Sequence, residues 1–208
     1  AFAALGQLLA DLAADGSGTY APLAERDLTE PLGLTTLAPE DVNDPALAQG
    51  FRYRPAASGA GPATTAPGTK VVPAPYFENT GAFMGAGGFV STIGDMTSLT
   101  AAFLGYSPGP LTSSLTRTLV PIETCAFQGG TCGRPGQPVL HQGMAWEIHA
   151  NPAFDCGYAF KNGGTTGFHS ATAVVADRDY GVTALTNSPT YANGLAVQVA
   201  IGMAAMYP

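Results

Sequence analysis

The sequence predicts an α+β fold in which helices precede an antiparallel sheet and a last helix flanks that sheet. Three observations carry this prediction. Apolar residues recur at helical spacing in several segments before residue 120, whereas short β-rich runs separated by turn residues lie between residues 144 and 186. Beyond Pro189, an apolar run that ends at Pro208 indicates a closing helix.

Two amphipathic helices are expected near the start of the chain. Residues 2–14 carry phenylalanine and leucine at helical spacing, and Asp15 and Gly16 stop the run. Residues 20–32 repeat the helical spacing and end at Gly33. We expect the second helix to pack on the first.

The middle of the chain predicts two more helices and much irregular structure. Residues 38–76 are rich in Pro, Gly, Ala and Thr and show little periodicity, which indicates a long irregular surface segment. After a glycine-rich turn at residues 85–88, Ser91 and Thr92 supply a helix cap before an apolar run that ends near Gly105. A short helix at residues 111–119 and a cysteine-bearing loop at residues 121–138 are expected to follow.

Four β-strands are predicted in the last part of the chain, at residues 144–148, 158–161, 170–176 and 181–186. Asp177 to Tyr180 forms a natural hairpin connection between the last two. We therefore divide the chain into a mainly helical and irregular region, residues 1–120, and a region of strands and a final helix, residues 121–208.

The composition excludes several classes of function. Hydrophobic residues make up 46% of the chain and charged residues 11%, which is typical of a folded globular protein. The net charge is -7 and the few basic residues are scattered, so nucleic acid is not an expected partner. The apolar stretch at residues 194–206 is shorter than the roughly 20 residues that cross a bilayer, so no membrane span is expected.

The cysteines predict an oxidising compartment. Cys125 and Cys132 bracket a loop with two glycines and are candidates for a disulfide, which favours a secreted or periplasmic protein. The alternative is three reduced, buried cysteines, and Cys156 is left over in either case. Because the chain begins Ala1-Phe2-Ala3, without an initiator Met or a basic, apolar leader, we expect a mature, trimmed or cleaved product.

The tetrapeptide Lys161-Asn162-Gly163-Gly164 is the candidate functional motif. It combines a cation, an amide side chain and backbone N–H groups that a substrate can approach closely, because neither glycine carries a Cβ. These groups suit the handling of a developing negative charge. By itself such a tetrapeptide is also an ordinary hairpin turn.

The surrounding sequence resembles a known family. The stretch from Tyr158 to Ser170, followed by Tyr180 to Asn187 and the last helix, is similar to the Lys-Thr-Gly strand region of serine β-lactamases, DD-peptidases and related esterases. Three other segments agree in order with that family: Glu30-Pro31-Leu32-Gly33-Leu34 with Pro-Leu-Gly-Met, Gly88 to Met96 with Gly-Gly-Ser-Thr-x-x-Asp-Met, and Gly143 to Glu147 with Gly-x-Gly-Trp. The resemblance implies a β-lactamase/transpeptidase-like fold over nearly the whole chain.

The resemblance also implies roles for the motif. Lys161 matches the lysine that keeps the site positively charged and supports proton transfer, and Gly164 would supply one oxyanion N–H. Asn162 and Gly163 would contact substrate. Asn162 replaces the usual Thr or Ser, and an amide differs from a hydroxyl in reach, so the resemblance leaves three substrate classes open: a β-lactam, a D-amino-acid peptide and an ester.

The nucleophile of that family is absent from these residues. The only lysines are Lys70 and Lys161, and neither stands in Ser-x-x-Lys. The family's Tyr-x-Asn motif would fall just upstream of Ala1, and we interpret Tyr191-Ala192-Asn193 as a packing element because it lies after the Lys161 motif. We therefore expect an N-terminal segment of the same precursor as partner, without which the fold is incomplete and leaves a sheet edge and an apolar face exposed.

The functional hypothesis is a serine hydrolase that forms an acyl-enzyme and is inactive as this chain alone. Two alternatives are a non-catalytic binding or scaffolding module with the same fold and an unrelated lectin-like α+β domain. His141, His149 and His169 form no metal-binding spacing, so neither a metal nor a cofactor is expected. His169 would act in proton transfer if it faced the cleft, and is otherwise a surface or core histidine with satisfied hydrogen bonds.

Overall fold

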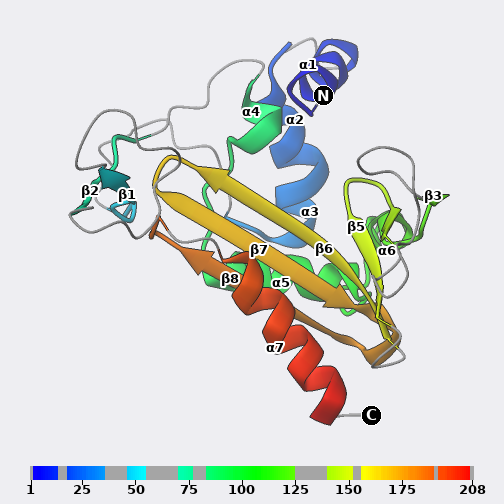
Figure 1. Ribbon diagram of the computed structural model, residues 1–208. Helices are drawn as coiled ribbons and strands as arrows, with labels where there is room; N and C mark the ends of the chain where they lie inside the picture. Colours follow the sequence, from blue (N-terminus) through cyan, green and yellow to red (C-terminus); the bar gives the residue numbers. More distant parts are fainter. Residues whose placement is uncertain are drawn as a thin grey trace.

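A computed structural model describes residues 2–13, 18–35, 46–54, 70–76, 83–124, 140–151, 156–189 and 192–206. Helices gather around an antiparallel sheet, with α5 on one face and the last helix, α7, on the other (Figure 1). This arrangement confirms the predicted α+β class. Among the described residues, no helix has the length and apolar character needed to cross a membrane.

The N-terminal helices follow the predicted periodicity. Helix α1 spans Phe2–Leu12, and a second helical run consists of α2 (Tyr20–Ala24), the π-helix η1 (Glu25–Thr29) and α3 (Glu30–Leu32). The run ends at Gly33, whose φ of 63° is the left-handed conformation that glycine adopts most easily. The two helices contact each other, as expected.

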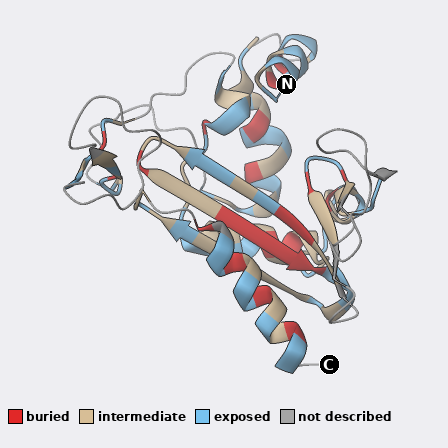
Figure 2. Ribbon diagram, in the orientation of Figure 1, coloured by how far each residue is buried: buried red, intermediate tan, exposed pale blue. Residues whose placement is uncertain are grey.

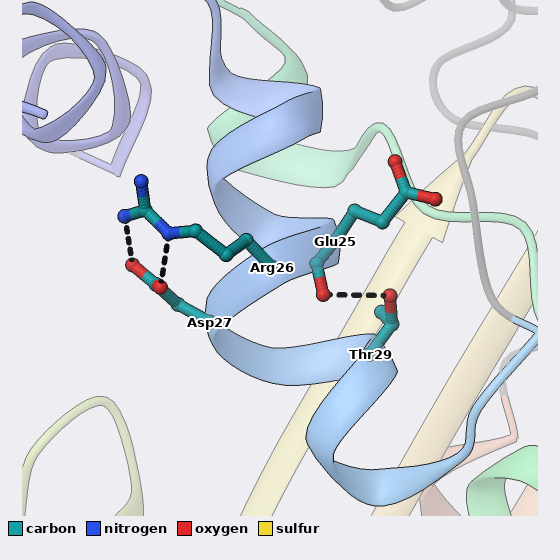
Figure 3. A network of polar contacts seen from close by, with 4 residues as sticks. All are labelled: Glu25, Arg26, Asp27 and Thr29. Atoms are coloured by element: carbon teal, nitrogen blue, oxygen red, sulfur yellow. Dashed lines mark hydrogen bonds and ion pairs between the residues drawn. The ribbon is translucent and has the colours of Figure 1, made fainter. Parts of the chain in front are cut away.

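The π-helix carries a local network of polar contacts (Figure 3). Arg26 donates to both carboxylate oxygens of Asp27, at 2.6 and 2.7 Å, and these hydrogen bonds hold the pKa of that carboxyl below its usual range. Thr29 is buried and donates to the carbonyl oxygen of Glu25 at 3.3 Å. The Arg26–Asp27 pair faces solvent, whereas the buried Thr29 hydroxyl bonds a backbone carbonyl on the inner side of the helix.

The middle of the chain differs from the prediction at two places. Part of the segment expected to be irregular forms a two-stranded antiparallel ribbon from β1 (Phe51–Arg54) and β2 (Lys70–Pro73). Of the glycines expected in a turn at residues 85–88, Gly85 and Gly87 belong to a short helix, α4 (Met84–Gly87), and Gly88 caps its end. This helix contacts α1, and a Cβ added to Gly85 would lie 3.1 Å from the Cα of Gly6, so glycine allows close approach of the two helices.

Two further helices agree with the sequence. Helix α5 (Ile93–Phe103) begins at the cap residue Thr92, whose hydroxyl accepts from the backbone N–H of Asp95 at 3.1 Å. Asp95 in turn accepts from the backbone N–H and hydroxyl of Thr35, at 3.1 and 2.8 Å, and so ties the end of the α3 run to α5. Helix α6 (Thr112–Thr118) follows and contacts α5.

Six strands form the main sheet in the order β3-β4-β5-β6-β7-β8, with every neighbouring pair antiparallel. Their bounds are β3 Glu123–Thr124, β4 Leu140–Gln142, β5 Glu147–Asn151, β6 Cys156–Thr165, β7 Phe168–Val175 and β8 Tyr180–Thr186. The order matches the chain order, as expected of a meander. The prediction of a strand at residues 144–146 is wrong, because Ala145 has a φ of 68° and these residues form the turn before β5.

The sheet has a core on each face. On the face that packs against α5, which we call the helical face, Trp146, Ala159 and Val174 are buried together with partly buried Phe103 and Ile148. On the other face, the α7 face, alternate residues of β7 and the alanines of α7 (Asn193–Met206) form the larger core. Figure 2 shows burial concentrated where β7 passes between the two layers, whereas α1 is largely exposed.

Candidate active site

Lys161 lies on β6, an inner strand of the sheet, directly opposite Thr172 of β7. Side chains alternate between the faces of a strand, and Ala159, two residues earlier, belongs to the core beneath α5. Lys161 therefore stands on the helical face. Its side chain is exposed, and the ammonium donates to the carbonyl oxygen of Asn162 at 3.1 Å.

The edge of β6 that would face β5 is open along the motif. Pairing of β5 with β6 ends at Glu147 opposite Phe160, whereas pairing of β6 with β7 continues to Thr165 opposite Phe168. From Lys161 to Thr165, β6 thus has a strand neighbour on one side only among the described residues. Alternate backbone N–H and C=O groups on the open side are available to a bound molecule.

The two glycines of the motif are tightly fitted against β7. A Cβ added at Gly163 would lie 2.8 Å from the hydroxyl oxygen of Ser170, and one at Gly164 would lie 3.0 Å from the Cδ2 atom of His169. Both glycines are exposed. A side chain at either position would displace the Ser170 or the His169 side chain, whereas the glycines leave the strand backbone exposed.

Alternation along β6 separates the motif's two polar side chains. Asn162 is half-buried and stands opposite Ala171, a residue of the core beneath α7. Its side chain is thus on the α7 face, whereas Lys161 is on the helical face. A molecule bound on the helical face can contact the Lys161 ammonium. To contact the Asn162 amide as well, it must extend past the open edge of β6 to the α7 face.

His169 also belongs to the α7 face, since it precedes the buried Ala171 by two residues on β7. Its Nδ1 atom lies 3.0 Å from the carbonyl oxygen of Ser188, and the side chain is half-buried. The structure therefore does not bring His169 together with Lys161. Asn193 is the first residue of α7, and Tyr191 lies outside the described residues, as do Cys125 and Cys132.

The β1–β2 ribbon is fixed to the end of the motif strand. The N–H of Phe51 donates to the carbonyl oxygens of Gly167 and Asn187, at 3.3 and 3.0 Å, and the Asn187 side chain donates to the carbonyl of Gln49 at 2.9 Å. Figure 1 shows the ribbon beside the β6–β7 turn. Exposed Arg52 therefore stands near the end of the candidate site, a placement that the local sequence did not indicate.

Sequence reasoning also missed the neighbours of Lys161 on the helical face. Thr172 is buried and shares a chain of hydroxyl contacts with β8 and α5. Isolated threonines form no sequence motif, so only the strand register shows which of them lie on the same face as Lys161. In the part of the chain that the structure describes, no three His, Cys, Asp or Glu side chains gather as a metal site would require.

Comparisons with known proteins agree with the fold. The beta-lactamase family profile matches residues 1–201. Among solved structures, the chain is similar to a class C beta lactamase from Rhodobacter sphaeroides, with a TM-score of 0.69, 17% identity, and coverage of 100% of this chain and 59% of that chain. No curated protein matches the chain.

Two further solved structures have the same fold. A beta-lactamase from Sulfitobacter sp. EE-36 gives a TM-score of 0.65 and 22% identity over 99% of this chain and 56% of that chain. A beta-lactamase/D-alanine carboxypeptidase from Pseudomonas syringae gives a TM-score of 0.62 and 19% identity over 96% of this chain and 56% of that chain. The chain thus spans little more than half the length of these proteins. Since the family profile extends over nearly all residues and the fold agrees, the chain belongs to the beta-lactamase family.

Proposed function

We propose that the chain is part of a serine hydrolase that cleaves amide or ester bonds through an acyl-enzyme. In this proposal, an N-terminal segment of the same precursor carries Ser-x-x-Lys and Tyr-x-Asn. The substrate is a β-lactam, a D-amino-acid peptide or an ester. Family membership and the names of the similar structures, which include a D-alanine carboxypeptidase, support the first two of these classes.

The observation that carries the proposal is the position of Lys161 beside the open edge of β6. A scissile carbonyl that lies along this edge would have its oxygen near the backbone N–H of Gly164, while the N–H of the nucleophile supplies a second donor. The Lys161 ammonium, on the same side of the sheet as α5, would stabilise negative charge and assist proton transfer. The Gly164 N–H is held by strand backbone, so this donor needs little reorganisation during the reaction.

Exposed apolar surface supports the companion segment. Five large side chains of α1 are between 47% and 72% exposed, namely Phe2, Leu5, Leu8, Leu9 and Leu12. Strand β8 is last in the sheet order, so its outer edge has no strand neighbour among the described residues. Contiguous apolar surface and open strand edges are both features that partners cover. We assign both surfaces to the upstream segment of the precursor.

An oxidising compartment, secreted or periplasmic, remains part of the proposal and depends on a disulfide between Cys125 and Cys132. It is checked by peptide mass mapping of the intact protein without reductant. A linked peptide pair of these cysteines is expected, and recovery of both as free thiols would contradict the disulfide.

A non-catalytic binding module with the same fold is the second candidate. Asn162, which replaces a hydroxyl residue and stands on the α7 face, favours it. In that case the open edge of β6 binds a peptide or small molecule without cleaving it. The two candidates differ in whether any polypeptide of the protein contains an activated serine.

Active-site probes separate these candidates. The intact protein is treated with a fluorophosphonate and with a fluorescent penicillin, and the labelled polypeptide is identified by mass. We expect a serine upstream of this chain to be labelled, and Lys161→Met to slow labelling by about 100-fold, the usual contribution of a proton-transfer group. Lys70→Met is the matched control, since Lys70 is the only other lysine of the chain and lies on the ribbon. Absence of labelling by both probes would refute the hydrolase.

A further inference from the structure

Ser170 places a hydroxyl over the motif strand. It lies on β7 directly opposite Gly163 of β6, and a Cβ added at Gly163 would lie 2.8 Å from the Ser170 hydroxyl oxygen. The hydroxyl therefore points toward β6 and occupies space that a side chain of the motif strand would fill. Because Gly163 is exposed, the half-buried hydroxyl lies beside backbone that a bound molecule can reach.

The Ser170 hydroxyl stands on the same face of the sheet as Lys161. Ser170 precedes Thr172 by two residues, and Thr172 is opposite Lys161, so all three belong to the helical face. On its other side Ser170 is opposite Leu185 of β8, which is 39% exposed. Gly163, Ser170 and Leu185 thus form a row across three strands in which no member is buried.

The proton of this hydroxyl is available to a ligand. Ser170 makes no side-chain hydrogen bond to any residue that the structure describes. The next hydroxyl on the same face differs, since the Thr172 oxygen lies 3.0 Å from that of Thr183, which lies 3.2 Å from that of Thr100. A half-buried hydroxyl without a partner has lost part of its contact with water, so a bound acceptor restores a hydrogen bond there.

The charge of the surroundings favours an anion as that acceptor. Strands β6, β7 and β8 contain no Asp or Glu, and Lys161 is their only Lys or Arg. The Lys161 ammonium donates to the neutral carbonyl of Asn162 and makes no ion pair with a described residue. Lys161 and Ser170 are diagonal neighbours on paired strands, about 7 to 8 Å apart, which a long side chain can span. One carboxylate, with two acceptor oxygens, can therefore bind both groups.

We propose that Ser170 is a specificity-determining residue that donates its hydroxyl proton to a carboxylate of the substrate, while Lys161 supplies the opposite charge. Asn162 stands where the family motif has a hydroxyl residue, and its side chain lies on the other face; Ser170 supplies a hydroxyl from the neighbouring strand. This favours β-lactams and D-amino-acid peptides, which carry a carboxylate, over simple esters. The role rests on the proposed function, because it concerns the substrate of the same site.

The test compares two probes of an activated serine that differ in charge. A fluorescent penicillin carries a carboxylate and a fluorophosphonate carries none, so the ratio of their labelling rates in the intact protein measures carboxylate recognition. We expect Ser170→Ala to lower the ratio of penicillin to fluorophosphonate labelling about ten-fold, the effect of losing one hydrogen bond to a charged group. Damage to the fold or to the nucleophile would slow both probes and leave the ratio unchanged.

Ser114→Ala is the matched control, because Ser114 is an exposed serine on α6, outside the sheet. It should keep the ratio within about two-fold of the parent. The role of Ser170 is overturned if Ser170→Ala changes the ratio no more than Ser114→Ala does. It is also overturned if the parent reacts with the fluorophosphonate but not with the penicillin.

Failure of the proposed function gives a different result. If neither probe labels the parent, fluorescence anisotropy measures reversible binding of the same penicillin to the intact protein. A Kd about ten-fold weaker in Ser170→Ala than in Ser114→Ala would refute the hydrolase and leave carboxylate binding by Ser170 standing. Equal affinities of the two variants, or no binding by the parent, would refute both.

Discussion

Replacement of Gly167 by alanine tests the attachment of the β1–β2 ribbon to the end of the motif strand. Gly167 has a φ of 88°, and an added Cβ would lie 2.7 Å from the Cβ of Ala74 and 2.9 Å from the backbone nitrogen of Phe51. Ordinary carbon contacts are about 3.5 to 4 Å. The ribbon must therefore move away from the turn, which weakens the hydrogen bonds that the Phe51 N–H donates to Gly167 and Asn187.

The expected cost has three parts. A left-handed backbone conformation costs a non-glycine residue about 1 kcal/mol. The weakened hydrogen bonding of Phe51 adds up to about 1 kcal/mol, and overpacking adds about 1 to 2 kcal/mol. We expect the free energy of unfolding to fall by about 2 to 4 kcal/mol in Gly167→Ala.

The control is Gly33→Ala, because Gly33 has a φ of 63° and nothing lies within 4 Å of an added Cβ. It should cost only the backbone part, about 1 kcal/mol. Urea unfolding of the intact protein, followed by the fluorescence of Trp146 and by circular dichroism, measures both. If the two variants are destabilised equally, the ribbon is not attached through Gly167 and its tight contacts have no energetic consequence.

Two further predictions concern the α7 face. Burial lowers the pKa of His149 and outweighs the opposing effect of the Glu147 carboxylate, 3.6 Å away, so the unfolded chain takes up the imidazole proton at higher pH than the folded chain. As the pH falls below about 6.5, this group therefore reduces the free energy of unfolding, and above that pH it has no effect. His149→Gln should show a smaller loss of stability between pH 7.5 and 5 than the parent in urea unfolding, and an equal loss would contradict the assignment. Tyr180→Phe removes the hydrogen bond from the Tyr180 hydroxyl to the carbonyl of Ala200, at 2.6 Å, and should cost about 1 kcal/mol in thermal unfolding. Tyr106→Phe, at an exposed tyrosine, is its control, and equal melting temperatures would count against the Tyr180 bond.

The elements that the sequence predicted well are those defined by local signals. Helix α5 begins at Thr92 because a hydroxyl at that position caps the first turn, and the cap is visible in the sequence. Strands β7 and β8 were predicted within two residues at each end, since β-rich runs and a polar connection define them. Trp146 was placed on a strand because of its apolar neighbours, whereas no local signal in the sequence marks the positive φ of Ala145.

Features that depend on pairing over long separations were missed. The ribbon joins two four-residue strands that are 15 residues apart in sequence, and neither strand is distinctive alone. The candidate site shows the same contrast between contiguous motifs and pairings over long separations. The Lys161 motif was found from the sequence because its residues are contiguous, but Thr172, Thr183 and Thr100 come from three elements and only the folded chain brings them together. Which face each motif side chain occupies also required the strand register.

The buried alanines along α7 limit which substitutions its contact with the sheet can accommodate. Ala192, just before the helix, and Ala196, Ala200 and Ala204 within it recur at every fourth residue and are at most 6% exposed. A methyl group is the smallest side chain that a chiral residue carries, so the distance between helix and sheet already stands near its minimum. A larger side chain at any of these positions overpacks the contact with β7, whose other face carries Thr172. Larger residues at these four positions are therefore expected to shift β7 and, with it, the neighbouring Lys161 motif on β6, although none of the four belongs to that motif.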